Sequence, residues 1–261
     1  MKIFLQFLFI CAFTYSFSQK ADNSFHGFYE EKKDETFYKK FEFDGNGKVL
    51  IAGLDYGDYF TRNDSIIVYP DKSIFIFKIQ KNGNLKGVSD WVDKGTWALK
   101  KDSIVESKRL NPEQATKNAI LLAEYFDKTK KKSDIDMLFS DETSKINEDL
   151  CNKGLAKACL NLFGLKMLQY TPDLLNGAEN IPSKKLKPHP ELIALSKKII
   201  SLGDPEGHTV LGSYYYVLGL KDKANKEWDK AIEMGSGKAG VTKGLTEFTE
   251  SLEDESIIQE D

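Results

Sequence analysis

Few residues of this chain combine the types and the spacing that enzymatic or metal-binding chemistry requires. The 261 residues include only three histidines, His26, His189 and His208, and none of them stands at metal-ligand spacing from a cysteine or a carboxylate. His208 falls within a predicted helix, where a packing role is the simpler interpretation. We therefore expect no catalytic residue and no metal site.

Two glycine-containing segments match ligand-binding loops only in part. Residues 235–238, Gly-Ser-Gly-Lys, lack the upstream glycine of a phosphate loop and are followed by Ala239 instead of Ser or Thr. Residues 44–47, Asp-Gly-Asn-Gly, begin like a calcium loop, but Lys48 follows where an oxygen ligand is needed. We interpret the second segment as a tight turn, and we expect no cofactor.

Residues 1–18 have the pattern of a secretory signal peptide. Lys2 precedes an apolar run from Ile3 to Phe13, and Ser16 and Ser18 form a small-x-small cleavage site. The apolar run is too short to cross the roughly 30 Å hydrocarbon core of a bilayer comfortably. We expect cleavage after Ser18 and a periplasmic or secreted protein with no stable membrane insertion.

Removal of this segment leaves two cysteines, Cys151 and Cys159. An even number of cysteines in an exported chain favours a disulfide, because the compartments outside the cytosol are oxidising. The alternative is that both residues are small buried thiols on neighbouring helices.

The composition is that of an ordinary globular protein. The chain has 37 Lys+Arg and 40 Asp+Glu, a net charge of −3 and 41% hydrophobic residues. This balance gives no reason to expect a nucleic-acid partner. The length corresponds to one or two domains.

Short runs rich in aromatic and aliphatic residues predict β-strands in the first half of the chain. The predicted strands are residues 37–43, 48–52, 65–69, 73–79 and 95–100. Segments rich in Gly, Asn or Pro separate several of them and suit tight turns, at residues 44–47, 69–72 and 81–84. Successive hairpins predict an antiparallel meander with one apolar face.

Two Gly-x-aromatic units lie near the ends of this β-rich segment, Gly27-Phe28-Tyr29 and Gly95-Thr96-Trp97. They resemble the corresponding units of lipocalin-like small barrels. The resemblance implies a small barrel or half-barrel over residues 19–107 with an apolar pocket. The alternative is that aromatic side chains fill the small β core.

From Asn111 onward the apolar period changes to about 3.6, which predicts helices. An internal repeat follows, since residues 151–162 align with residues 200–211. In each copy a glycine, Gly154 or Gly203, ends one helix just before the next begins. The sequence therefore predicts an α+β chain, with an antiparallel β-domain followed by an α-α helical stack.

The second copy of the repeat continues in a pattern that resembles a tetratricopeptide repeat. The matching residues are Leu211, Gly212, Tyr215, Ala224, Trp228 and Ala231. The chain departs from the family pattern at His208, where a bulky residue is usual, and at Ser236, where proline is usual. The resemblance implies helix pairs near residues 112–152, 155–202 and 204–234, closed by a capping helix near residues 238–249.

Cys151 and Cys159, with Gly154 between them, resemble the helix-junction disulfide of cysteine-rich Sel-one-like repeats, which are relatives of the tetratricopeptide class. The resemblance implies a bond between these two cysteines. Some proteins of this class have been linked to β-lactam hydrolysis, but the chain contains no Ser-x-x-Lys motif. A β-lactamase-like hydrolase is therefore only a minor alternative.

The sequence thus divides into a signal peptide (1–18), a β-domain (19–107), helical repeats (108–249) and an acidic tail (250–261) that has six acids and no base. A Pro-rich stretch at residues 171–190 interrupts the middle helix pair. Connections of this length are functional or disordered, and the sequence does not decide between the two.

We expect a non-enzymatic, exported protein of the cell envelope that binds a protein or peptide on the concave face of its helical stack. Thr209, Ser213 and Tyr216 recur at helical spacing and are predicted to line that face; the alternative is that they are ordinary exposed residues. Two other functions stay open, which are carriage of a small apolar ligand by the β-domain and neutralisation of a toxin by an immunity-type protein.

Overall fold

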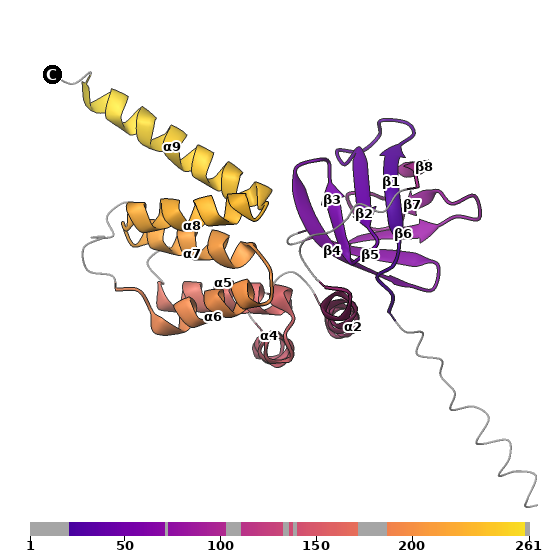
Figure 1. Cartoon of the computed structure of the whole chain (residues 1–261), viewed down its shortest axis with the longest axis horizontal. Coiled ribbons are helices and arrows are strands. Elements are labelled where there is room, and N and C mark those ends of the chain that lie inside the picture. Colours follow the sequence, from indigo (N-terminus) through magenta and orange to yellow (C-terminus); the bar gives the residue numbers. More distant parts are fainter. Residues whose placement is uncertain are drawn as a thin grey trace, which may run out of the picture.

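The computed structural model consists of a β-barrel followed by a stack of helices (Figure 1). The predicted signal peptide and most of the Pro-rich stretch lie outside the residues that the structure describes, which are 21–70, 73–102, 111–132, 136–137, 140–171 and 187–258. Among these residues, no helix has the length and apolar character needed to cross a bilayer.

Eight antiparallel strands form a closed barrel in which each strand pairs with its neighbours in sequence and β1 pairs with β8. The antiparallel β-domain predicted from the sequence is therefore confirmed. The strands are β1 (His26–Glu31), β2 (Lys40–Asp44), β3 (Lys48–Ile51), β4 (Asp55–Arg62), β5 (Ser65–Tyr69), β6 (Phe75–Ile79), β7 (Leu85–Gly87) and β8 (Thr96–Lys101).

The predicted turns lie between strands, but the predicted strands omit β1, β4 and β7 and place one boundary too early. The sequence does not predict β4, because Asp55, Gly57 and Asp58 are poor strand formers. In the barrel, Gly57 lies so close to β5 that an added Cβ would be 2.8 Å from the Tyr69 carbonyl oxygen. Residues 37–39, predicted as strand, belong instead to the loop before β2.

Buried side chains, about half of them aromatic, fill the interior of the barrel. Trp97 is fully buried, with the rings of Phe41 and Phe77 edge-on at 5.5 and 5.2 Å, and its indole N–H donates to the Tyr38 carbonyl at 2.9 Å. The buried residues of this core are Tyr29, Phe41, Phe43, Val49, Ile51, Tyr59, Ile66, Val68, Phe75, Phe77, Leu85, Val92 and Trp97.

The helical half follows the helix pairs predicted from the sequence. Its described helices are α2 (Pro112–Thr129), α4 (Asp141–Lys153), α5 (Ala156–Tyr170), α6 (Pro190–Ser201), α7 (Glu206–Val217), α8 (Lys221–Glu233) and α9 (Gly237–Ile258). Successive helices from α4 to α9 pack on each other, and α7 also contacts both α5 and α9. The last helix extends past its predicted end at residue 249, so most of the predicted tail is helical.

A second core joins the barrel to the helices. Alternate residues of a strand point to opposite faces, so Tyr59 enters the barrel while Phe60 points outward. Phe60, with Ile67 and Tyr69 of β5, packs into the same buried cluster as Leu122 of α2. Because α2 covers the outer face of β4 and β5, these two strands bury apolar side chains on both of their faces.

Candidate functional site

The two cysteines form a disulfide at the junction of α4 and α5, with their sulfur atoms 2.11 Å apart. Gly154 ends α4 in the left-handed conformation, with φ of 102°, and its N–H donates to the Cys151 carbonyl at 3.0 Å. The bond therefore fastens the last turn of one helix to the first turn of the next. The structure brings together the two cysteines paired by the sequence resemblance.

The three residues predicted to line a concave face differ in their accessibility. Thr209 is 2% exposed, and its hydroxyl lies 3.1 Å from that of Ser236, so it is not available to a partner. Ser213 is half-buried and donates to the Thr209 carbonyl. Tyr216 is also half-buried, with its ring 5.8 Å from that of Trp228. The predicted set is therefore not one continuous exposed surface.

Helix α9 packs on the rest of the protein mainly with a polar face. Ala239 is buried against α8, but the residues that follow on this face, such as Lys243 and Glu250, are polar. Two ion pairs hold the face in place, Lys243 to Asp229 at 2.6 Å and Glu250 to Lys221 at 2.8 Å. Beyond Ala239, this face of the helix therefore meets the stack with polar side chains.

The apolar face of α9 is turned to solvent. Val241, Leu245, Phe248 and Leu252 are 63, 62, 61 and 50% exposed, and they recur at spacings of four, three and four residues along one side of the helix. We refer to these four residues as the α9 stripe. In Figure 1, α9 diverges from α8 toward its C-terminal end.

A stripe of this kind is an unusual feature for a protein surface. Single exposed apolar side chains are common, but a contiguous apolar patch marks an interaction site in soluble proteins. The amphipathic pattern of α9 is also inverted, since its polar side lies against the protein and its apolar side against water. The α9 stripe is therefore the candidate functional surface.

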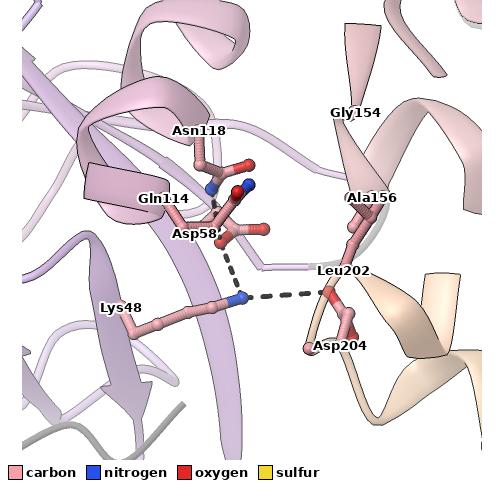
Figure 2. A pocket seen from close by; sticks show the side chains of 9 residues that line it. Lys48, Asp58, Gln114, Asn118, Gly154, Ala156, Leu202 and Asp204 are labelled. Atoms are coloured by element: carbon pink, nitrogen blue, oxygen red, sulfur yellow. Dashed lines mark hydrogen bonds and ion pairs between the residues drawn. The ribbon is translucent and has the colours of Figure 1, made fainter. Parts of the chain in front are cut away.

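A buried charge cluster lies where the barrel meets the helices (Figure 2). The Lys48 ammonium of β3 lies 2.7 Å from Asp58 of β4 and 3.8 Å from Asp204, in the connection between α6 and α7. Asn118 of α2 donates to Asp58 at 3.2 Å. The cavity beside these groups holds about 10 Å³, at most the space of one water molecule, so the cluster is a structural junction and not a ligand pocket.

Glu206, in the first turn of α7, is a second buried charge near this junction. Burial raises the pKa of its carboxyl above the ordinary value, although a hydrogen bond from Ser236 opposes the shift. The neighbouring carboxylate of Asp204 adds to the increase by repulsion.

The histidines have structural partners. His208 Nδ1 lies 2.6 Å from a carboxylate oxygen of Glu227, and both side chains are mostly buried between α7 and α8. His189 caps the N-terminus of α6, where its Nδ1 accepts from the Glu191 N–H. Within the described part of the chain, no group of three or more His, Cys, Asp or Glu residues has the geometry to hold a metal ion.

Comparison of this chain with protein-family models, curated proteins and solved structures found no match. The candidate site is therefore defined by the geometry of the chain alone.

The sequence contains the signal for the α9 stripe, but that signal is ambiguous. The spacing of Val241, Leu245 and Phe248 is visible in the predicted capping helix, and it would ordinarily indicate the face that packs on the stack; Leu252 lies in the segment predicted as a tail. Only the three-dimensional structure shows that this face points away from the stack.

Proposed function

We propose that this chain is a non-catalytic, exported binding protein that recognises a protein partner through helix α9. The observation that carries the proposal is the inverted orientation of α9, with its polar face held by ion pairs and its four large apolar side chains in water. A partner that covers the α9 stripe would remove these side chains from solvent, which is the main favourable contribution to most protein associations.

The filled interior of the barrel supports a binding role for the helices rather than a carrier role for the β-domain. The residues that face the interior, including Phe41, Phe75, Phe77 and Trp97, are fully buried and in contact with each other. A carrier of small apolar ligands needs an open, ligand-sized volume in this position. We assign the barrel the role of a rigid platform for the helical half.

The arrangement of the helices supports the resemblance to tetratricopeptide and Sel-one-like repeats. Gly154 and Gly203 both adopt positive φ where one helix passes to the next, and Gly207 lies where an added Cβ would be 2.8 Å from the Ser196 carbonyl oxygen of α6. We propose that the helical half is a short solenoid of this class, with α9 as the last of its described helices. In a longer solenoid, the next helix would cover the face that carries the stripe.

The disulfide supports the proposed export. Disulfides persist in oxidising compartments, so the bonded state of Cys151 and Cys159 is consistent with a periplasmic or secreted location after signal cleavage.

Site-specific photo-crosslinking tests the binding role. A photoreactive phenylalanine analogue is placed at Phe248, and a control analogue at Lys226, which is exposed on α8. We expect protein adducts of discrete mass from position 248 in the native envelope, and their loss when Leu245→Glu is added. Equal labelling from the two positions would contradict the proposal.

A further inference from the structure

We infer that the partner of the α9 stripe is a second copy of the same chain, bound so that the two α9 helices run antiparallel. This inference rests on the binding role proposed for α9. It follows from the spacing of the stripe, from the residues that flank it and from the distribution of charge along the helix.

The spacing of the stripe suits a pair of helices. Val241, Leu245, Phe248 and Leu252 alternate at four and three residues, which is the spacing that keeps one apolar seam facing a partner helix. The midpoint of the stripe lies between Leu245 and Phe248. A twofold axis at this point places Leu245 of each copy beside Phe248 of the other and Val241 beside Leu252, so both ends of the seam are covered.

The residues that flank the seam allow two helices to approach closely. Thr242, Gly244, Thr249 and Ser251 are small and uncharged, and they occupy the positions next to the apolar seam that in many coiled coils carry charged residues. No Cβ added at Gly244 would meet another atom within 4 Å, so the space beside the seam is open. These flanks bring no like charges together when two copies pair.

The charge along α9 selects the antiparallel orientation. Its first turn contains Lys238, whereas residues 253–255 are Glu-Asp-Glu. In a parallel pair the two acidic ends would lie side by side and repel each other. In an antiparallel pair the acidic end of each helix lies beside the basic N-terminal end of the other, where the helix dipole also favours negative charge.

The same acidic residues argue against a lipid surface as the partner. Helices that lie in a membrane interface carry Lys or Arg beside the apolar face, because biological membranes have a negative surface potential. Here Thr242, Gly244, Thr249 and Ser251 flank the stripe without a positive charge, and an acidic run follows it at residues 253–255. A soluble protein surface with matching polarity is the better fit, and a second α9 provides one.

Sedimentation of the full mature chain over about 1–200 µM tests the inference. The stripe has only four apolar residues, far fewer than the roughly 20–30 residues that each partner contributes to a standard interface, so we expect a dimer with a dissociation constant on the order of 10 µM. Leu245→Glu and Phe248→Glu should each raise the dissociation constant of the dimer by at least about tenfold. Ile120→Glu, the same kind of change at a 44% exposed position on α2, should leave it unchanged. Far-UV circular dichroism confirms that each variant is folded.

Disulfide trapping tests the orientation independently of these variants. A mixture of Val241→Cys and Leu252→Cys chains should form a mixed dimer on mild oxidation, and each chain alone should form much less. Crosslinking of Val241→Cys with itself would indicate a parallel pair and overturn the proposed geometry.

The outcomes separate this inference from the proposed function. A chain that stays monomeric up to 200 µM while position 248 still crosslinks to a different protein overturns the inference and leaves the binding role intact. A monomeric chain with no adduct at position 248 contradicts both.

Discussion

Gly212 of α7 shows how a single small residue sets the distance between two helices. The indole of Trp228, from α8, lies against it, and an added Cβ would be 2.6 Å from that ring. Trp228 is 1% exposed, so its ring has little room to move. Gly212 belongs to the Leu-Gly pair that resembles a tetratricopeptide repeat. In this protein a larger residue at that position would collide with the ring of Trp228.

We predict that Gly212→Ala destabilises the fold by about 1–3 kcal/mol, because the new methyl group overpacks the site of Trp228. Gly164→Ala is the matched control, since Gly164 is exposed in α5 and nothing lies within 4 Å of its added Cβ. There the substitution should stabilise the protein by up to about 1 kcal/mol through helix propensity. Urea denaturation followed by circular dichroism measures both; equal effects at the two sites would contradict the steric explanation.

Glu206 makes stability depend on pH in a defined direction. Its pKa is raised by burial in the folded state above the ordinary value of 4.5, so the folded state binds this proton more tightly than the unfolded state does. The cost of burying the charge is therefore absent well below pH 4.5. It appears as the pH rises through this value and reaches its full size above the folded pKa.

We predict that Glu206→Gln is more stable than the parent protein at pH 7 and equal to it near pH 3.5, because glutamine keeps an acceptor for Ser236 without the charge. Urea midpoints at several pH values provide the measurement, with the exposed Glu233→Gln as control. A difference in stability that does not change with pH would show that charge burial is not its source.

At the scale of elements, the disulfide fixes one junction between two helices. It joins residues only eight apart in sequence, so the chain-entropy contribution is modest. The same junction already has a left-handed glycine and a hydrogen bond from Leu155 N–H to the Leu150 carbonyl at 2.9 Å. The covalent bond therefore reinforces a geometry that the backbone also specifies.

We predict that reduction of this disulfide lowers the free energy of unfolding by about 2–3 kcal/mol without loss of the fold. Thermal and urea denaturation with and without a thiol reductant measure the effect. The double variant Cys151→Ser/Cys159→Ser should have the stability of the reduced protein and should not respond to the reductant. A response in that variant would mean that the reductant acts elsewhere.

At the scale of the whole molecule, the barrel and the helices form one folded unit. The outer face of β4 and β5 shares an apolar cluster with α2, α4, α5, α6 and α7, and the Arg62 guanidinium of β4 binds the Asp127 carboxylate of α2 at 2.8 Å. The Lys48 cluster also joins β3 and β4 to the α6–α7 connection (Figure 2). Movement of the barrel relative to the stack would break buried charge pairs as well as apolar contacts.

We predict that Lys48→Met costs about 3–5 kcal/mol, because it leaves Asp58 and Asp204 buried without their shared cation. Lys78→Met removes a 2.6 Å pair with Asp64 that is largely exposed, and it should cost much less because solvent screens the pair. Urea denaturation gives both values. Comparable costs for the two variants would show that the Lys48 cluster does not hold the halves together.

The amino-acid sequence by itself determines the local structure of this protein. Alternating aromatic runs and Gly-Asn turns specify hairpins, and Gly154 and Gly203 specify where one helix passes to the next. These features act between residues close in sequence, where side-chain period and backbone φ decide the outcome.

Only the tertiary structure decides which faces are buried. Strand β4 forms in spite of Gly57 and Asp58 because β3 and β5 flank it and Lys48 neutralises the buried carboxylate. Thr209 is predicted to be accessible, but it is buried beside Ser236, where α9 begins. Phe248 has the spacing of a residue that packs on the stack, but it is 61% exposed. The orientation of an amphipathic helix depends on contacts with residues outside that helix. For α9 these contacts include the ion pairs with Asp229 and Lys221 of α8. The sequence pattern within the helix cannot show which of its faces makes them.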